Sequence, residues 1–257
     1  MIEILKDYNP ISLAEMGGIR LMNRTDTKFV TTEAKLRQLL AMAAGDYLVQ
    51  EIDGLRIGRY YTRYFDTPEC EMFRAHQCGR LNRQKLRVRS YVDSRINFLE
   101  VQTKNNRGRT KKHRIAVEGF DPDKNYDSSL TLASSNYAGF LGQYLRYDIG
   151  LMAPKIENRF NRITLVNTGK TERLTIDTGL RFHHIGSGAN LSLDGIVIIE
   201  LKRDGLIPSP ILAMLRELRV RPMGFSKYCI GMAMTDPGVR INRFKPRLAR
   251  IGRILAS

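Results

Sequence analysis

The sequence predicts an α+β fold in which about eight antiparallel strands close into a barrel with a polar lumen, flanked by helices. Two patterns support this prediction. Lys85, Arg87 and Arg89 alternate with apolar residues, and an extended strand places successive side chains on opposite faces. Later segments that are otherwise apolar also carry charged residues, which a dry core excludes. A barrel accommodates both patterns, because its apolar side chains point outward to helices and its polar ones point inward.

The composition indicates a polyanionic partner. The 257 residues include 42 basic and 26 acidic side chains, which gives a net charge of +16 and a pI near 10.0. Nucleic acid, anionic lipid or phosphate-rich small molecules are the partner classes that fit this charge. No apolar run approaches the ~20 residues of a membrane helix, and the N-terminus does not resemble a secretory signal. Cys70, Cys78 and Cys229 lack metal-type spacing and fit reduced thiols in a cytoplasmic protein.

The first 80 residues alternate between helical and extended patterns. Ser12 and Glu15 have the spacing of a capping box, and Asp53-Gly54 is a dipeptide that favours β-hairpins. Apolar residues at helical spacing predict a longer helix before Gly45. The predicted elements are a helix around 12–16, a strand within 18–32, a helix at 32–43, two strands within 47–67 that form a hairpin, and a helix at 69–76.

The segment 83–114 is the most basic part of the chain, with eleven Lys or Arg residues and two acids. Its first strand carries the Lys85 alternation. In its second strand Glu100, Gln102 and Lys104 share one face, opposite Leu99 and Val101. These patterns predict two neighbouring strands with a cationic face, ending in a turn rich in Asn, Arg and Gly. A half-exposed hairpin with a solvated charged face is the alternative interpretation.

The second half of the chain reads mainly as strands. The predicted elements are a loop or capped helix start at 121–135, a helix at 137–147, strands at 153–167, 173–180, 181–185 and 195–202, and a helix at 208–218. The tail 240–253 has six basic residues and no acid. No linker divides the chain, so one domain over 1–257 is expected, with a core at about 11–234 and a basic extension at 235–257.

The strand around Glu200 points most directly to a charged interior. Its apolar residues lie on both faces, yet Glu200 and Lys202 share one of them. An unpaired charge in a dry core would cost several kcal/mol, so this end of the strand is expected to face a wet lumen. Cations that converge on one lumen imply a polyphosphate group, and a retained carboxylate implies a divalent metal. A structural ion pair between Glu200 and Lys202 is the alternative.

Eight short motifs follow one another between Ile11 and Met234. They are Arg24-Thr-Asp26-Thr-Lys28-Phe, Tyr64-Phe-Asp-Thr, Lys85-Leu-Arg87-Val-Arg89-Ser-Tyr, Phe98-Leu-Glu100-Val, Phe160-Asn-Arg162, Arg173-Leu-Thr-Ile-Asp, Ile199-Glu200-Leu-Lys202 and Phe225-Ser-Lys227-Tyr. In this order they resemble the VTC (vacuolar transporter chaperone) domain, the polyphosphate polymerase branch of the triphosphate tunnel metalloenzymes. The resemblance implies a tunnel barrel that uses ATP and Mn²⁺ or Mg²⁺ to extend a polyphosphate chain.

The resemblance also implies roles for individual residues. Glu200 would hold the metal. The expected phosphate-contacting catalytic residues are Lys28, Arg87, Arg89, Arg162, Arg173 and Lys227. Further substrate contacts are expected from Arg24, Lys85, Gln102, Lys104, Arg159, Lys202 and His76.

Two positions depart from the family pattern. The first of its two Glu-x-Lys strands reads Glu100-Val-Gln102 here, with a lysine only at Lys104, and His76 stands where an arginine is expected. Gln102 brings no charge to chemistry that depends on charge. Lys104 or Lys85 is a candidate to compensate.

Three classes of function follow. The first is synthesis of polyphosphate from ATP, or triphosphate hydrolysis by the same scaffold. The second is a module that binds polyphosphate without turnover. The third, nucleic-acid binding, is disfavoured because few aromatics accompany the cations and no DNA-binding motif occurs. The basic tail is expected either to remain solvated or to dock a membrane protein partner or anionic lipid, at the inner face of the membrane.

Overall fold

The computed structural model describes residues 1–19, 24–123, 132, 135–205 and 207–256. Its helices are α1 (Ile2–Leu5), α2 (Leu13–Gly17), α3 (Glu33–Ala43), α4 (Glu71–Gln77), α5 (Ser135–Tyr144), a 3₁₀ turn (Ile149–Leu151), α6 (Pro210–Glu217), α7 (Lys227–Thr235) and α8 (Lys245–Leu255). Its strands are β1 (Pro10–Ile11), β2 (Arg24–Thr32), β3 (Tyr47–Gln50), β4 (Gly58–Asp66), β5 (Arg83–Tyr91), β6 (Ile96–Lys104), β7 (Thr110–Ala116), β8 (Ala153–Asn167), β9 (Glu172–His184), β10 (Asn190–Leu193) and β11 (Ile196–Asp204).

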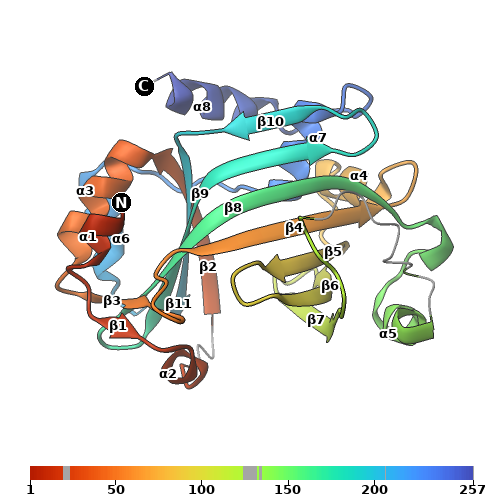
Figure 1. Cartoon of the computed structure of the whole chain (residues 1–257). Coiled ribbons are helices and arrows are strands. Elements are labelled where there is room, and N and C mark those ends of the chain that lie inside the picture. The colour runs from red at the N-terminus through yellow and green to blue at the C-terminus, as the bar shows by residue number, and fades with distance from the viewer. Residues whose placement is uncertain (20–23, 124–131, 133–134, 206, 257) are drawn as a thin grey trace.

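All eleven strands belong to one sheet, which bends strongly so that β5, β6 and β7 lie beneath β4 and β8 (Figure 1). Eight of them form an antiparallel path in the order β2-β11-β9-β8-β4-β5-β6-β7. The predicted α+β class, the antiparallel sheet and the flanking helices are confirmed. In the described part of the chain no hydrogen-bonded ladder joins β2 to β7, so closure of the barrel by strand pairing is not seen.

The free edge of β2 is bordered instead by the segment that leads into α7. Pro222 forms an isolated bridge with Phe29, and the backbone N–H of Met223 donates to the carbonyl of Lys28 at 2.8 Å. A few residues later, Ser226 accepts a hydrogen bond from Lys85 of β5 at 2.9 Å. This segment therefore connects the β2 edge to a strand on the far side of the sheet.

Three helices support the outer face of β2, β11, β9 and β8. Alternate residues of these strands are apolar and point to this face, so the helices bury them against their own apolar stripes. Helix α3 begins at the cap Thr32, whose side chain accepts from Lys35 N–H, as predicted from its helical spacing. The buried cluster combines Leu36, Leu39 and Leu40 of α3, Ile211 and Leu215 of α6 and Leu5 of α1 with Phe29, Ile163, Leu165, Leu174, Ile176, Val197, Ile199 and Leu201 of the sheet.

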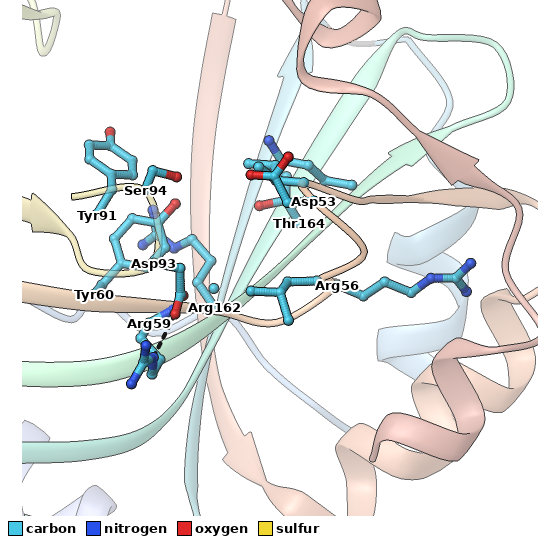
Figure 2. Close-up of a pocket in the computed structure, with 13 residues that line it drawn as sticks. Asp53, Arg56, Arg59, Tyr60, Tyr91, Asp93, Ser94, Arg162 and Thr164 are labelled. Carbon is cyan, nitrogen blue, oxygen red and sulfur yellow. Dashed lines mark hydrogen bonds and ion pairs between the residues drawn. The ribbon is translucent and has the colours of Figure 1, made fainter. Parts of the chain in front are cut away.

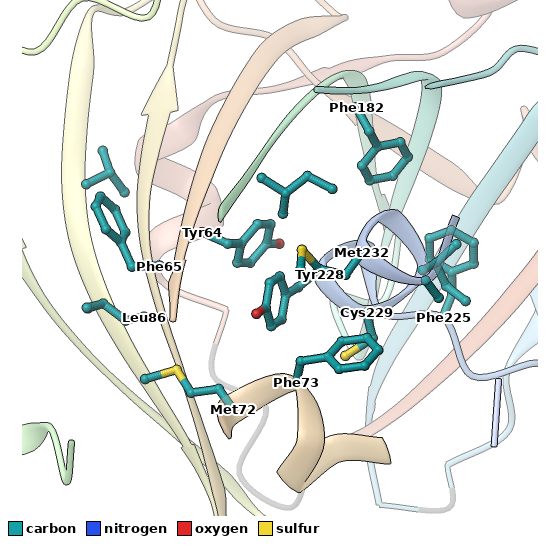
Figure 3. Close-up of a cluster of buried hydrophobic side chains, with 14 of the residues drawn as sticks. Tyr64, Phe65, Met72, Phe73, Leu86, Phe182, Phe225, Tyr228, Cys229 and Met232 are labelled. Carbon is teal, nitrogen blue, oxygen red and sulfur yellow. The ribbon is translucent and has the colours of Figure 1, made fainter. Parts of the chain in front are cut away.

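A second apolar cluster lies where α4 and α7 pack together (Figure 3), and α8 joins it through Ile251. The Tyr228 ring of α7 stacks on Tyr64 of β4 at 5.2 Å, and Phe73 of α4 packs on both Tyr228 and Phe244. Gly231 lets α7 approach the sheet closely, because a Cβ there would lie 2.6 Å from the Ile156 side chain. We call the sheet face opposite to the one covered by α1, α3 and α6 the inner face. The second apolar cluster fills the space beside one end of it.

Several sequence predictions are confirmed at the level of single elements. Ser12 and Glu15 form the predicted capping box of α2. The two predicted neighbouring strands within 83–114 are β5 and β6, which pair with each other, and β8 spans the predicted 153–167. The predicted helices at 69–76, 137–147 and 208–218 correspond to α4, α5 and α6. The structure does not describe most of 121–135.

Other predictions are wrong. The strands on either side of Asp53-Gly54 do not form a hairpin, because β3 and β4 pair with successive parts of β8 and the dipeptide only turns the chain between them. Segments 173–180 and 181–185 form one strand, β9. Its pairing with β8 shifts register between Arg159 and Asn161 of β8. Strand β7 and the short α1 and β10 were not predicted from the sequence. In β7 most residues are polar, so the alternation typical of a strand is hidden. The basic tail folds into α8, with Phe244 and Ile251 in the second apolar cluster.

Replacing Asp66 by Ala tests what holds α4 and α7 to the sheet. The buried Asp66 carboxylate accepts from the N–H groups of Met72 and Phe73 at 2.9 Å each and from the Tyr228 hydroxyl. We expect the variant to lose about 2–4 kcal/mol of unfolding free energy, because a helix cap is lost and buried donors stay unpaired. Urea unfolding measures this value. The exposed Glu69→Ala is the control, and equal stability of the two variants would contradict the assignment.

Candidate functional site

The strand register brings most of the predicted site residues to one side of the sheet. Direct cross-strand neighbours share a face, so each pairing extends the set to the next strand. Arg87 lies opposite Glu100, Lys85 opposite Gln102, and Lys28 opposite Glu200. We call this side the charged face. It comprises Asp26 and Lys28 of β2, Glu200 and Lys202 of β11, Arg173 and Asp177 of β9, Arg162 of β8, Lys85, Arg87 and Arg89 of β5, Glu100, Gln102 and Lys104 of β6, and Lys112 and Arg114 of β7.

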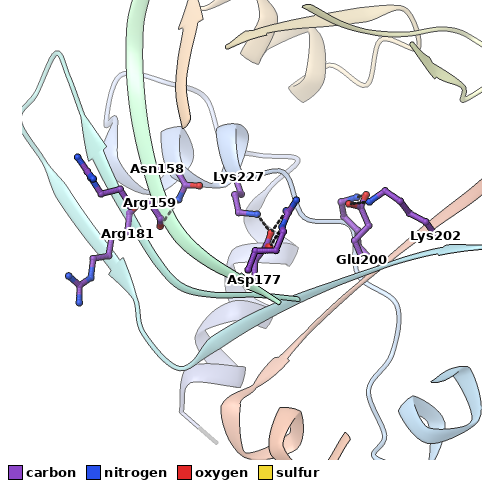
Figure 4. A network of polar contacts seen from close by, with 9 residues as sticks. Asn158, Arg159, Asp177, Arg181, Glu200, Lys202 and Lys227 are labelled. Atoms are coloured by element: carbon purple, nitrogen blue, oxygen red, sulfur yellow. Dashed lines mark hydrogen bonds and ion pairs between the residues drawn. The ribbon is translucent and has the colours of Figure 1, made fainter. Parts of the chain in front are cut away.

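The first carboxylate of the charged face, Glu200, bonds to two lysines. Its Oε1 accepts from Lys28, and its Oε2 accepts from Lys202 at 2.6 Å (Figure 4). Burial alone would raise the Glu200 pKa, but Lys202 and Lys28 hold it below the ordinary value. The ion pair between Glu200 and Lys202, which was the alternative interpretation, therefore exists within one strand, and it is part of the charged face.

The second carboxylate, Asp177, joins the sheet to α7. Arg162 donates to both of its oxygens, at 2.6 and 2.9 Å, and Lys227 donates to Oδ2 (Figure 4). Despite burial, these cations lower the Asp177 pKa. Burial in turn lowers the pKa of Lys227 to about 8 even though Asp177 opposes the change. Helix α7 thus presents its first residue, Lys227, to the charged face.

The third carboxylate, Glu100, is fully buried. Arg87 donates to its Oε2 through Nε at 2.8 Å and Nη2 at 2.6 Å, and the Lys112 ammonium lies 3.2 Å from Oε1. Burial opposes ionisation, yet Arg87, Arg89 and Lys112 lower the Glu100 pKa to about 2. Each carboxylate of this series therefore holds two cations, so the charged face keeps an excess of positive charge.

Arg89 carries part of that excess. Its side chain is only 9% exposed, its Nε has no hydrogen-bond partner among the described residues, and burial and repulsion by Arg87 lower its pKa. Burial also lowers the pKa of Lys85, which donates a hydrogen bond to the neutral Ser226 hydroxyl. Cations held in this way favour an anion that would pair with them.

A cavity of about 110 Å³ opens at one end of the charged face (Figure 2). Arg162 and Thr164 line it from β8, and Tyr60 and Tyr91 line it from β4 and β5. The two tyrosine rings lie 5.0 Å apart, and the Arg162 guanidinium lies 4.9 Å from the centre of the Tyr60 ring. The cavity therefore combines a cation from the charged face with aromatic surface.

Three predicted residues are not placed on the charged face. Arg159 lies on the opposite face, as Figure 4 shows, and pairs with Asp123 at 2.8 Å. His76 belongs to α4 and packs on Phe244, and burial together with nearby cations lowers its pKa to about 3. Arg24 begins β2, but its side chain lies outside the described part of the chain.

Sequence reasoning missed Asp177 and Lys112 as members of this site. The signal for Asp177 was present in the motif Arg173-Leu-Thr-Ile-Asp, because residues 173, 175 and 177 alternate on one strand face. Lys112 lay in a segment taken for a turn. His183 and His184 also take no part in the charged face; His184 accepts from Ser187 and lies 3.5 Å from Asp236.

Within the described ranges no three His, Cys, Asp or Glu side chains gather as a metal site. Magnesium in phosphoryl-transfer sites needs only one or two carboxylates, because substrate phosphates supply further oxygens. Glu200 meets this requirement, being 20% exposed and therefore reachable from the charged face. Because the Glu200 carboxylate is ionised, it could release one of its lysines and bind a metal ion instead.

No helix of the described residues is long and apolar enough to cross a membrane.

Comparison with known proteins supports the sequence resemblance. The model of the VTC domain matches residues 23–235. A putative adenylyl cyclase from Hippeastrum, described as having a dominant triphosphatase activity, shares 16% identity with a TM-score of 0.51, over 83% of this chain and 97% of its own. A putative adenylate cyclase from Bacillus halodurans shares 12% identity with a TM-score of 0.49, over 80% and 96%. No curated protein matches. The chain belongs to the VTC domain family.

Proposed function

We propose that the protein is an ATP-dependent polyphosphate polymerase, which transfers the terminal phosphoryl group of ATP to a growing polyphosphate chain. The observation that carries the proposal is the excess of buried cations on the charged face after Glu100, Asp177 and Glu200 have each taken two. Polyphosphate is the ligand class whose charge density meets this excess, and both the donor and the acceptor of the reaction carry it.

The proposed division of labour requires no side-chain nucleophile. Arg87, Arg89 and Arg162 would bind phosphate oxygens and align the donor with the acceptor, and Lys28 and Lys227 would neutralise charge as it redistributes. Glu200 would hold Mn²⁺ or Mg²⁺, which when bound supplies further neutralisation of the phosphates. Arg173 and Lys202, side by side on β9 and β11, would extend the phosphate contacts.

The state of the carboxylates favours transfer to a phosphate over hydrolysis. A general base that activates water works best with a pKa near the operating pH, and the pKa values of Glu100, Asp177 and Glu200 are all lowered. A terminal phosphate is already ionised and needs no base. Triphosphate hydrolysis and binding without turnover are the alternatives.

The test of this function uses purified protein with γ-labelled ATP and Mn²⁺, with products resolved by size. A ladder of labelled polymers supports the polymerase. Free phosphate as the only product supports hydrolysis, and binding without product formation supports the binding module.

The remaining expectations extend the proposal. One domain over 1–257 would carry the activity, with its core at 11–234 and 235–257 as a basic extension that packs on this core through Phe244 and Ile251. The proposed setting is the cytoplasm, with the extension against a partner at the inner face of the membrane.

Glu200→Gln tests the metal ligand. The amide keeps the shape but loses the charge, so Mn²⁺ should no longer strengthen tripolyphosphate binding, and metal-dependent turnover should be lost. Calorimetric titration with and without Mn²⁺ measures this effect. Glu157→Gln removes a carboxylate paired with Arg63 on the opposite face and should keep the metal response. An intact Mn²⁺ response in Glu200→Gln would remove Glu200 from the site.

Arg87 and Arg89 are expected to differ although they are neighbours on one strand. Arg87→Ala deprives the buried Glu100 of its main partner and should cost about 3–5 kcal/mol of unfolding free energy. Arg89→Ala removes an unpaired buried cation, so the empty protein should be at least as stable, while tripolyphosphate affinity falls by about 1.5–3 kcal/mol. Thermal unfolding with and without tripolyphosphate measures both effects. The exposed Arg181→Ala is the control, and a loss of stability in Arg89→Ala would refute its assignment.

Lys104 is expected to take the role of the lysine that the family pattern has at the position of Gln102. Lys104 contributes to a group of cations with Arg83 and Lys28, and with burial these neighbours lower its pKa. Lys104→Ala should therefore slow polymerisation by about 10²-fold, the effect of one electrostatic contact, and Lys104→Arg should restore much of it.

Gln102→Lys should be neutral or harmful, because residue 102 lies between Lys85 and Lys112 on neighbouring strands. Initial rates of polymer formation compare the variants, with Lys111→Ala on the exposed opposite side of β7 as the control. Faster synthesis by Gln102→Lys together with an unaffected Lys104→Ala would show that Lys104 does not compensate.

A further inference from the structure

We propose that Arg83, Arg243 and Arg247, here named the arginine cluster, form a second polyanion subsite that binds a polyphosphate chain extending beyond the charged face. The inference rests on the proposed function for its ligand class, and it concerns residues outside the site described above. It assigns a role to the N-terminal part of the α8 segment, which the proposed chemistry does not use.

The arginine cluster is continuous with the charged face. Arg83 is the first residue of β5; it lies opposite Lys104 of β6 and two positions before Lys85 on the same strand side. On the other side, Arg247 lies beside Gly224, where a Cβ would be 3.9 Å from its Nη2. Gly224 is two residues before Ser226, the partner of Lys85. A chain leaving Lys85 and Lys104 would therefore meet these arginines next.

Packing holds the arginines in place. The Arg243 guanidinium occupies the space that a Cβ at Gly79 would fill, just after the C-terminus of α4. Phe244 is buried against Phe73 at 5.5 Å, which anchors the start of α8. Arg247 lies over the Phe244 ring at 5.9 Å, and Arg83 donates to the Arg80 carbonyl at 2.7 Å. A ligand would find a surface that is largely preorganised.

No carboxylate neutralises the cluster. In the part of the chain that the structure describes, none of its three arginines forms an ion pair, whereas Glu100, Asp177 and Glu200 of the charged face each have two cations. Burial first, and then the proximity of Arg243 and Arg247, lower the pKa of Arg83. Burial and cations including Lys85 and Arg83 also keep His76 neutral. The local charge repulsion is relieved by an anion.

A polyphosphate chain fits this surface better than other polyanions do. Its closely spaced charges can bridge from Lys104 to the arginine cluster without a break. Single-stranded nucleic acid would need exposed stacking rings, but Phe244 is buried. A membrane-binding helix would expose its apolar face, whereas Phe244 and Ile251 of the α8 segment are buried in the second apolar cluster.

The test compares short and long ligands in full-length protein. We measure the affinities of tripolyphosphate and long-chain polyphosphate for the wild type and for the double variant Arg243→Gln with Arg247→Gln. Tripolyphosphate affinity should stay within about two-fold, whereas long-chain affinity should fall at least about ten-fold, as expected for lost charge-assisted contacts. The exposed single variant Arg243→Gln gives the same comparison if the double variant fails to fold.

A matched control separates the arginine cluster from general charge. Arg240→Gln with Arg253→Gln removes the same charge from exposed positions of the same tail and should leave both affinities unchanged. The inference is overturned if the two double variants lose long-chain affinity equally, or if the cluster variant loses none. It is also overturned if the cluster variant loses binding to phosphatidylserine vesicles or single-stranded DNA but keeps polyphosphate binding.

Failure of the proposed function gives a different result. A wild type that makes no polymer from ATP, but whose long-chain affinity depends on the arginine cluster, would reject the polymerase and retain the subsite. A wild type that makes polymer while the cluster variant binds long chains normally would reject only the subsite.

Discussion

Three carboxylates placed among more than twice as many cations set the character of this protein. Glu100, Asp177 and Glu200 each bond to two basic side chains, and burial strengthens those bonds because water competes weakly. Pairing removes much of the cost of burying charge, but it does not bring the charged face to neutrality. Among the described residues Arg89 and Lys85 form no ion pair with a carboxylate, and an anionic ligand would complete the electrostatic arrangement that the fold begins.

The fold maintains this arrangement by separating its polar and apolar surfaces along every strand. The outer apolar residues of β2, β11, β9 and β8 are buried by α1, α3 and α6, and this packing fixes the strands whose inner residues are charged. At one end of the inner face, α7 changes the surface from polar to apolar within two residues: Lys227 bonds to Asp177, while Tyr228 stacks on Tyr64. The apolar packing that anchors α7 therefore also positions a cation.

Local patterns predicted much of this structure. The alternation of Lys85, Arg87 and Arg89 predicted that they share a face, and the charges at Glu200 and Lys202 correctly indicated that one face of β11 is polar. Pairing between strands that are distant in the sequence was harder to predict. The Asp53-Gly54 turn has the local sequence of a hairpin, but the strands on either side of it, β3 and β4, both pair with β8. Arg159 was expected to contact substrate, but it is three residues from Arg162 on an unbroken stretch of β8, and this odd spacing places it on the opposite face. The carboxylate partners of the arginines depend on register, which sequence spacing alone does not determine.

Charge balance also couples binding to protonation on the charged face. Lys227 has its pKa lowered to about 8 in the empty protein, mainly by burial, and an arriving phosphate would favour the charged ammonium. Below that pH the lysine is already protonated and binding takes up no proton there. Above it, binding must be accompanied by protonation of Lys227, so the net affinity declines as the pH rises. Asp177 moderates this coupling because it stabilises the same ammonium, and it does so only while Arg162 keeps the carboxylate ionised. The pair that anchors α7 to the sheet thus also determines over which pH range the charged face keeps its full positive charge.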